Sequence, residues 1–194
     1  MKTFRVLSSA AALVAIVALP MRAQIAITPM VGGYIPASDV NQVTGSAQGI
    51  AKTRDGTLSL GANVDLGMLR GTLMYASGTT IKNASKEDIG KGSVLAAGAD
   101  LVIRPLPRIF VQPYLIAGAA EKFYKYSDTP SFFVDNGSDR DFAFHGGVGA
   151  DLMLGSIGVA AELTDFLSKG ADKKWNVHDA FLMVGMKFRL GGGN

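Results

Sequence analysis

From about residue 24 onward, hydrophobic and polar positions alternate with a period of two, the pattern of β-strands that have one apolar face. The alternation is clearest in four segments, at 58–66, 95–103, 142–152 and 180–190. It is less clean in four others, at 25–35, 68–77, 109–121 and 157–166. The pattern therefore predicts eight strands.

The predicted connections differ in length in a regular way. Three are short turns, at 67–68, 104–108 and 153–156. Four are long and polar and carry most of the lysines, near 36–56, 78–92, 122–141 and 167–178. Short turns at one end and long loops at the other are typical of an outer-membrane barrel. A sheet in lipid must close on itself, because every backbone N–H and C=O needs an internal partner.

The short turns also predict which residues face each other. A two-residue first turn pairs Asp65 with Arg70, and a five-residue second turn pairs Asp100 with Gln112. A four-residue third turn brings His145 diagonally across from Glu162, within reach for long side chains. In each predicted hairpin, polar residues meet polar residues on the inner face.

The inner face of the predicted barrel carries a polar network. Its candidate members are Asp65, Arg70, Asp100, Gln112, His145, Asp151, Glu162, Lys187 and Arg189. One interpretation is a salt-bridged plug that stabilises the barrel; the other is a narrow ion-conducting path gated by the same charges. The best outward candidates for an aromatic girdle are Tyr75, Phe110, Phe142 and Phe188.

The first 23 residues have the layout of a secretory signal peptide. Basic residues precede the apolar run 10–19, and Ala23 offers a small residue for cleavage. We therefore expect one mature barrel domain over 24–194. Three of the 19 basic residues would leave with the signal peptide, so the mature chain would hold 16 basic and 16 acidic residues. A neutral chain lacks the basic footprint of a nucleic-acid-binding protein.

Composition narrows the chemistry further. The chain has no cysteine, which excludes a disulfide framework and a lipid-modified N-terminal cysteine. Its two histidines match no metal-ligand spacing, so we expect no metal and no cofactor. Four loop carboxylates could bind calcium weakly but are interpreted as solvated charges: Asp128, Asp135, Asp139 and Asp141.

The chain resembles the small outer-membrane barrels of the OmpA/OmpX type. The resemblance covers nearly all of 24–190 and rests on the signal peptide, the loop asymmetry, the segment QPYLIAG at 112–118 and the closing strand 181–190. It implies an all-β, eight-stranded, antiparallel up-and-down barrel in the bacterial outer membrane. It also implies contact with outer-membrane lipid and lipopolysaccharide, and with the barrel-assembly machinery through the last strand. Such barrels include structural anchors, adhesins, small pores and a few lipid-modifying enzymes.

We expect a non-enzymatic barrel with a role in envelope integrity or surface interaction. The alternatives are a small diffusion pore, a lipid A hydrolase within the barrel wall, and a soluble lipocalin-like barrel with its apolar face inward. A hydrolase would need a serine near a histidine–carboxylate pair such as His145 and Glu162. Ser156 and Ser168 do not face that pair. Lipid A deacylases of this barrel type place a histidine and a serine two positions apart on one strand, whereas His178 is followed by Asp179 and Ala180.

Overall fold

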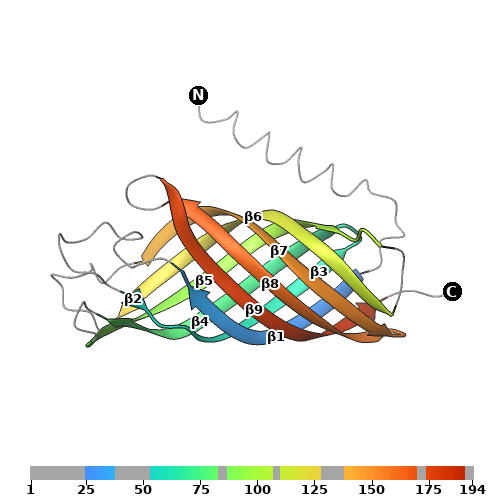
Figure 1. Ribbon diagram of the computed structural model, residues 1–194, viewed down its shortest axis with the longest axis horizontal. Helices are drawn as coiled ribbons and strands as arrows, with labels where there is room; N and C mark the ends of the chain where they lie inside the picture. Colours follow the sequence, from blue (N-terminus) through green and yellow to red (C-terminus); the bar gives the residue numbers. More distant parts are fainter. Residues whose placement is uncertain are drawn as a thin grey trace, which may run out of the picture.

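The computed structural model describes residues 25–37, 53–82, 87–106, 110–127, 138–169 and 174–190. The strands form one antiparallel sheet that closes into a barrel (Figure 1). They are β1 (Ile25–Pro36), β2 (Thr53–Arg54), β3 (Thr57–Leu66), β4 (Leu69–Lys82), β5 (Asp88–Ile103), β6 (Val111–Ser127), β7 (Ser138–Leu154), β8 (Ile157–Lys169) and β9 (Trp175–Leu190). No helix in the described ranges is long and apolar enough to cross a membrane.

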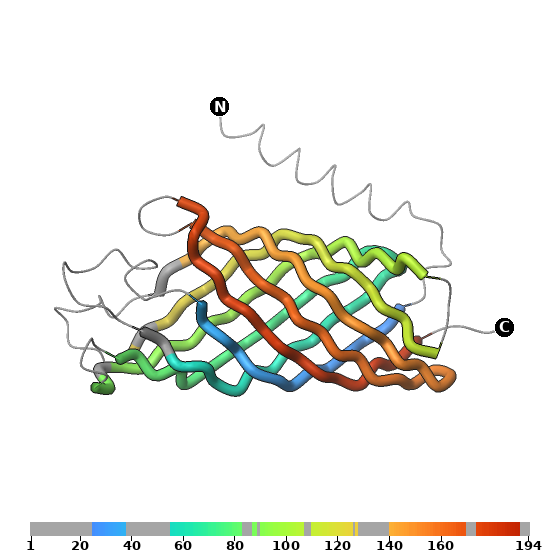
Figure 2. Tube along the Cα trace, in the orientation of Figure 1, coloured from blue at the N-terminus to red at the C-terminus, as the bar shows by residue number. Residues whose placement is uncertain are grey.

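The barrel wall has eight strand positions, as the period-two pattern predicts, because β2 and β3 share one position. From β3 onward each strand pairs with the next along the chain, and β1 closes the ring by pairing with both β3 and β9. The two residues of β2 pair with β4, as β3 does, so β2 extends the line of β3 towards the long-connection end. The described ends of the chain, Ile25 and Leu190, are direct partners across the closing seam (Figure 2).

The strands are staggered strongly around the barrel. A row of direct partners runs once around the barrel and returns to β1: Ala26, Asp65, Arg70, Asp100, Gly118, His145, Phe166, Asp179 and Pro36. One circuit therefore returns to β1 ten residues further along it, from Ala26 to Pro36. Because the strands are tilted, residues of one row lie at rising levels along the barrel axis.

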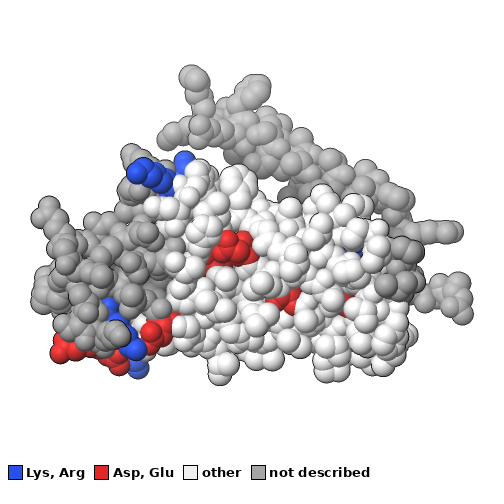
Figure 3. Space-filling view, viewed as in Figure 1, with Lys and Arg blue, Asp and Glu red and all other residues white. Residues whose placement is uncertain are grey.

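Side chains alternate between a buried lumen and an exposed exterior. Along β8, for example, Ile157, Val159 and Leu163 are 50, 48 and 46 % exposed, while Glu162 and Thr164 on either side of Leu163 are buried. Charged residues gather at the end that carries the long connections, and the rest of the visible exterior is largely uncharged apart from patches of acidic residues (Figure 3). This is the reverse of a soluble lipocalin-like barrel, so that alternative is wrong. An apolar exterior of this kind is what a bilayer covers.

Of the three strand pairings predicted at the short-turn end, one is confirmed and two are wrong. Asp65 pairs with Arg70 as predicted, across a turn in which Gly67 takes a φ of 68° that favours glycine. The third turn is tighter than predicted, because Gly155 adopts a φ of 69° and allows a two-residue turn between Leu154 and Ile157.

The second turn is where the prediction fails most. Asp100 pairs with Gly118, not with Gln112, and Gln112 pairs with Asp151 on β7. The prediction assumed a minimal turn between two level strands. In the staggered barrel β6 begins below the end of β5, so its first residues pair with β7 alone.

At the other end the strands run further than predicted. Much of the segments expected as loops near 78–92, 122–141 and 167–178 belongs to β4 to β9, and β6 and β7 reach 17 residues each. A membrane span needs only about 9–11 residues, so these strands rise beyond the apolar band. At this end Lys82 donates to Asp55 at 2.6 Å, and that hydrogen bond raises the pKa of Lys82.

Candidate functional site: the polar lumen

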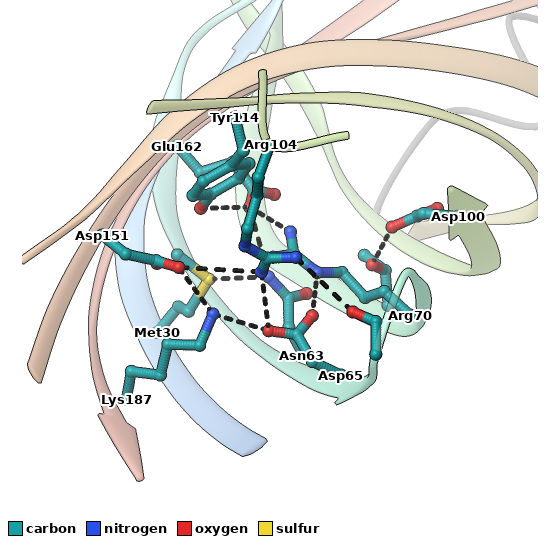
Figure 4. Close-up of polar contacts among 12 residues, drawn as sticks. Met30, Asn63, Asp65, Arg70, Asp100, Arg104, Tyr114, Asp151, Glu162 and Lys187 are labelled. Atoms are coloured by element: carbon teal, nitrogen blue, oxygen red, sulfur yellow. Dashed lines mark hydrogen bonds and ion pairs between the residues drawn. The ribbon is translucent and has the colours of Figure 1, made fainter. Parts of the chain in front are cut away.

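Polar and charged side chains fill the lumen in three clusters at different levels. The lower cluster lies near the short-turn end and centres on Arg70, which lies 2.6 Å from Asp65 and 2.5 Å from Glu162 (Figure 4). Lys187 Nζ contacts Asp65 at 2.6 Å and Asp151 at 2.8 Å. The two cations thereby link β3, β4, β7, β8 and β9 across the barrel interior.

Three further residues complete the lower cluster. Arg104, from the connection after β5, approaches Asp65 at 3.6 Å and Asp151 at 3.7 Å. Tyr114 and Asn63 donate to Glu162 at 3.1 and 3.3 Å. Three cations thus face three carboxylates, and each carboxylate has a cation within 4 Å. This pairing offsets the free-energy cost of desolvating the buried charges, which would be uncompensated if the groups were unpaired.

The middle cluster consists of His145, Asp100 and Thr72. His145 Nε2 and the Thr72 hydroxyl both contact the Asp100 carboxylate. The His145 ring stacks on Phe166, with ring centroids 4.5 Å apart. His145 therefore does not pair with Glu162 as predicted, because its direct partner on β8 is Phe166 and Glu162 lies opposite Gly149.

The upper cluster surrounds Asp179 near the long-connection end. Lys122 Nζ lies 2.7 Å from Asp179 Oδ2, and the hydroxyls of Tyr34 and Tyr124 both donate to the same carboxylate. All four side chains are at most 1 % exposed. Sequence reasoning missed this cluster, since it assigned Lys122 to a long loop. The available signal was the continued alternation of Ala120, Lys122 and Tyr124 with outward residues on β6.

Apolar side chains close the space between the middle and upper clusters. Phe166, Phe181, Met183 and Met74 are at most 1 % exposed and belong to one continuous core. The rings of Phe166 and Phe181 meet edge to face at 5.6 Å. Buried aromatic and thioether side chains therefore lie between the polar levels of the lumen.

The remaining predicted members of the network lie at its edge. Gln112 is buried opposite Asp151, and Arg189 is half-buried opposite Ala26 at the end of β9. Within the described ranges no three His, Cys, Asp or Glu side chains come together as a metal site. Asp128 and Asp135 lie outside the described residues, as do the predicted signal peptide and its cleavage site.

Two outward features complete the exterior. Phe142 and Phe144 on β7 and Trp175 on β9 form an aromatic group, with ring centroids 5.1 and 5.2 Å apart. Of the predicted girdle, Tyr75, Phe110 and Phe142 are exposed, while Phe188 is half-buried. His178 and Asp165 form a half-exposed outward pair at 2.7 Å.

A closed eight-stranded barrel, an apolar exterior and a charge-filled lumen define the protein as an outer-membrane β-barrel. The structure is similar to the outer membrane protein OprG from Pseudomonas aeruginosa, with a TM-score of 0.58, 15 % identity and coverage of 88 % of this chain and 97 % of that one. It is also similar to Neisserial surface protein A, with a TM-score of 0.52, 15 % identity and coverage of 86 % and 97 %. At this identity the likeness concerns the fold. No family model and no curated protein sequence matches the chain.

Proposed function

We propose that the protein is a sealed, non-enzymatic outer-membrane barrel that serves envelope integrity or surface interaction. The observation that carries the proposal is the burial of the lumen side chains at three successive levels. Apart from Arg104, the side chains of the lower cluster, of the aromatic and methionine layer and of the Asp179 cluster are almost completely buried. Eight strands enclose a lumen only wide enough for side chains.

The strand lengths support a role at the long-connection end. β5, β6 and β7 have 16, 17 and 17 residues, more than a span requires. The additional residues of these strands extend the barrel wall beyond the apolar band at the long-connection end. A barrel that only filled the membrane would not need this extension.

The pore alternative requires a continuous polar path, and the buried rings of Phe166 and Phe181 in the lumen argue against one. The hydrolase alternative requires a serine beside a histidine. Ser168 is buried in the lumen while His178 faces outward, and Ser156 lies in a turn at the short-turn end, away from His145. Neither histidine–carboxylate pair therefore has one of these serines as a nucleophile.

Planar-bilayer conductance of the purified full chain tests the proposal. We expect no steady channel in the unmodified protein, with a general porin in the same bilayer as the positive control. We also expect no channel from Lys187→Ala with Asp151→Ala, because the two upper levels remain closed in that variant. A steady, reproducible conductance from the unmodified protein would replace this proposal with the small pore.

Incubation with lipopolysaccharide tests the non-enzymatic part separately. We expect no release of fatty acid above that of a heat-unfolded sample. Release that is lost in His145→Ala or His178→Ala would establish the hydrolase instead.

A further inference from the structure

Pro29 and Pro113 both lie inside strands, but their surroundings in the sheet differ. Pro113 on β6 pairs with β7, and it precedes Leu115, the first residue of β6 that pairs with β5. At Pro113 the strand β6 is therefore an edge strand, which is a position that tolerates proline. Pro29 lies in β1, which pairs with β3 on one side and with β9 on the other.

The backbone ladder of the closing seam, between β1 and β9, is interrupted at Pro29. The structure describes both strands in full, and their direct pairing stops at Ile27 and resumes at Met30 on the same register. The two residues between them, Thr28 and Pro29, pair with β3 but not with β9. The interruption is therefore confined to the seam side of β1.

The direction of the N–H groups explains the interruption. Successive residues of a strand direct their N–H groups to opposite neighbours. Ala37, just after β1, donates its N–H to the carbonyl oxygen of His178, so the odd-numbered positions of β1 face β9. Pro29 is such a position, and proline has no N–H to donate. The register places the Met186 carbonyl opposite Pro29, where it lacks this donor.

The two strands nevertheless lie close together beside the interruption. A Cβ at Gly185 would collide with the carbonyl oxygen of Pro29, so the backbones of β1 and β9 have not separated there. Another contact must therefore compensate for the missing donor of Pro29.

Lys187 supplies a contact across the seam at the level of the interruption. The register places it opposite Thr28, and both side chains are directed into the lumen and are at most 3 % exposed. Lys187 Nζ crosses the inner face of β1 and lies 2.6 Å from Asp65 Oδ2 on β3 (Figure 4). Such a charge-assisted contact is stronger than the neutral backbone hydrogen bond that Pro29 cannot make.

The two carboxylates that hold Lys187 differ in their position relative to the seam. Asp65 lies on the far side of the seam, beyond β1. Asp151 lies 2.8 Å from Lys187 but belongs to β7, on the same side of the seam as β9. Only the contact with Asp65 can therefore hold the seam closed, and the contact with Asp151 provides a matched control.

We propose that Lys187 is a strap that closes the seam between β1 and β9 at a weak point created by Pro29. The strap joins β9 to β3 across the inner face of β1, where the backbone ladder is interrupted. The lower half of this seam, near the short-turn end, is therefore the first part of the barrel wall to open when Lys187 is released.

Hydrogen exchange of single amides, measured by NMR on the full chain in detergent micelles, tests the weak point in the parent protein. The amides of Ile27 and Val31 face β9, whereas those of Thr28 and Met30 in the same strand face β3. A missing hydrogen bond changes a local opening equilibrium by up to about tenfold. We therefore expect the two seam amides to exchange about tenfold faster than the two that face β3. Equal exchange of the four amides would overturn the proposal.

Variants then test the strap. Lys187→Met should speed the exchange of the seam amides at least about tenfold further, because the contact across β1 is lost. Asp151→Asn should leave these amides as in the parent, since Lys187 keeps Asp65. Heat-modifiable gel mobility confirms that each barrel is folded.

Restoring the donor separates the strap from a general loss of stability. Pro29→Ala gives the Met186 carbonyl an N–H, so the seam amides should exchange more slowly than in the parent. In the Pro29→Ala background, Lys187→Met should have little further effect on them. This comparison also serves if Lys187→Met alone does not fold. The proposal fails if Lys187→Met speeds exchange equally in the β5–β6 ladder and in the seam, or if its effect is the same with and without Pro29→Ala.

Discussion

Lys187 Nζ on β9 lies 2.6 Å from Asp65 Oδ2 on β3, although β1 separates these strands in the sheet. The contact crosses the inner face of β1 at the seam where the first and last strands meet. Lys187 also holds Asp151 on β7. The lower cluster therefore fastens the closing strand to both sides of the barrel, in addition to the backbone ladder.

Arg70 is the residue whose loss should destabilise the lower cluster most. Arg70→Leu leaves the buried Glu162 without its cation, which should lower the free energy of unfolding by about 3–5 kcal/mol. Arg70→Leu with Glu162→Leu should cost less than Arg70→Leu alone, because no unpaired charge remains. Denaturant unfolding of the barrel in lipid vesicles measures both values, with Lys82→Leu at the rim as a control expected to lose far less, because water screens its ion pair with Asp55. Single losses that simply add in the double variant would show that the two residues do not interact.

The Asp179 cluster allows the same test at a second level. Asp179→Leu leaves Lys122 fully buried without this carboxylate and removes the acceptor of two tyrosine hydroxyls. We expect a loss of about 3–5 kcal/mol in the free energy of unfolding. Adding Lys122→Met should recover a large part of that loss. If Asp179→Leu unfolds at the same denaturant concentration as the parent, the buried pair is not a stabilising element.

Gly118 should be intolerant of any side chain. A Cβ there would lie 2.5 Å from the carbonyl oxygen of Ala99 and from Asp100 Oδ1, and 2.9 Å from His145. Gly118→Ala must therefore push the middle cluster apart, at a cost of about 1–3 kcal/mol. Gly71 is the matched control, since a Cβ there meets nothing within 4 Å and points outward. Equal stability of the two alanine variants would contradict the close packing around Asp100.

Cysteine labelling tests which end of the barrel faces outward. The chain has no native cysteine, so single replacements report one site each. Cysteines at Ser46 and Ser85, which lie outside the described residues, and at Ser138, near the start of β7, should react with an impermeant thiol reagent on whole cells, because the sequence places all three in or beside the long connections. A cysteine at Ser156, in a short turn, should react only after the outer membrane is permeabilised. Labelling in the opposite pattern would reverse the topology.

The amino-acid sequence by itself determined the faces of the strands. A strand repeats every two residues, so Leu163 and Glu162 must lie on opposite faces wherever the strand is placed. The same alternation predicted the eight strands of the barrel wall, and the two-residue turn at Gly67 predicted the partners Asp65 and Arg70. These features depend on residues close together in the chain.

Only the tertiary structure decided which lumen residues meet. His145 contacts Asp100 and not Glu162, and Lys122 meets Asp179 from a segment predicted as a loop. Both outcomes depend on the stagger of ten residues per circuit, from Ala26 to Pro36. That stagger is the sum of seven connections and one seam, each of which can shift a strand by two residues without changing its buried face. Local alternation therefore cannot set the level at which a side chain stands in the lumen; closure of the whole barrel sets it.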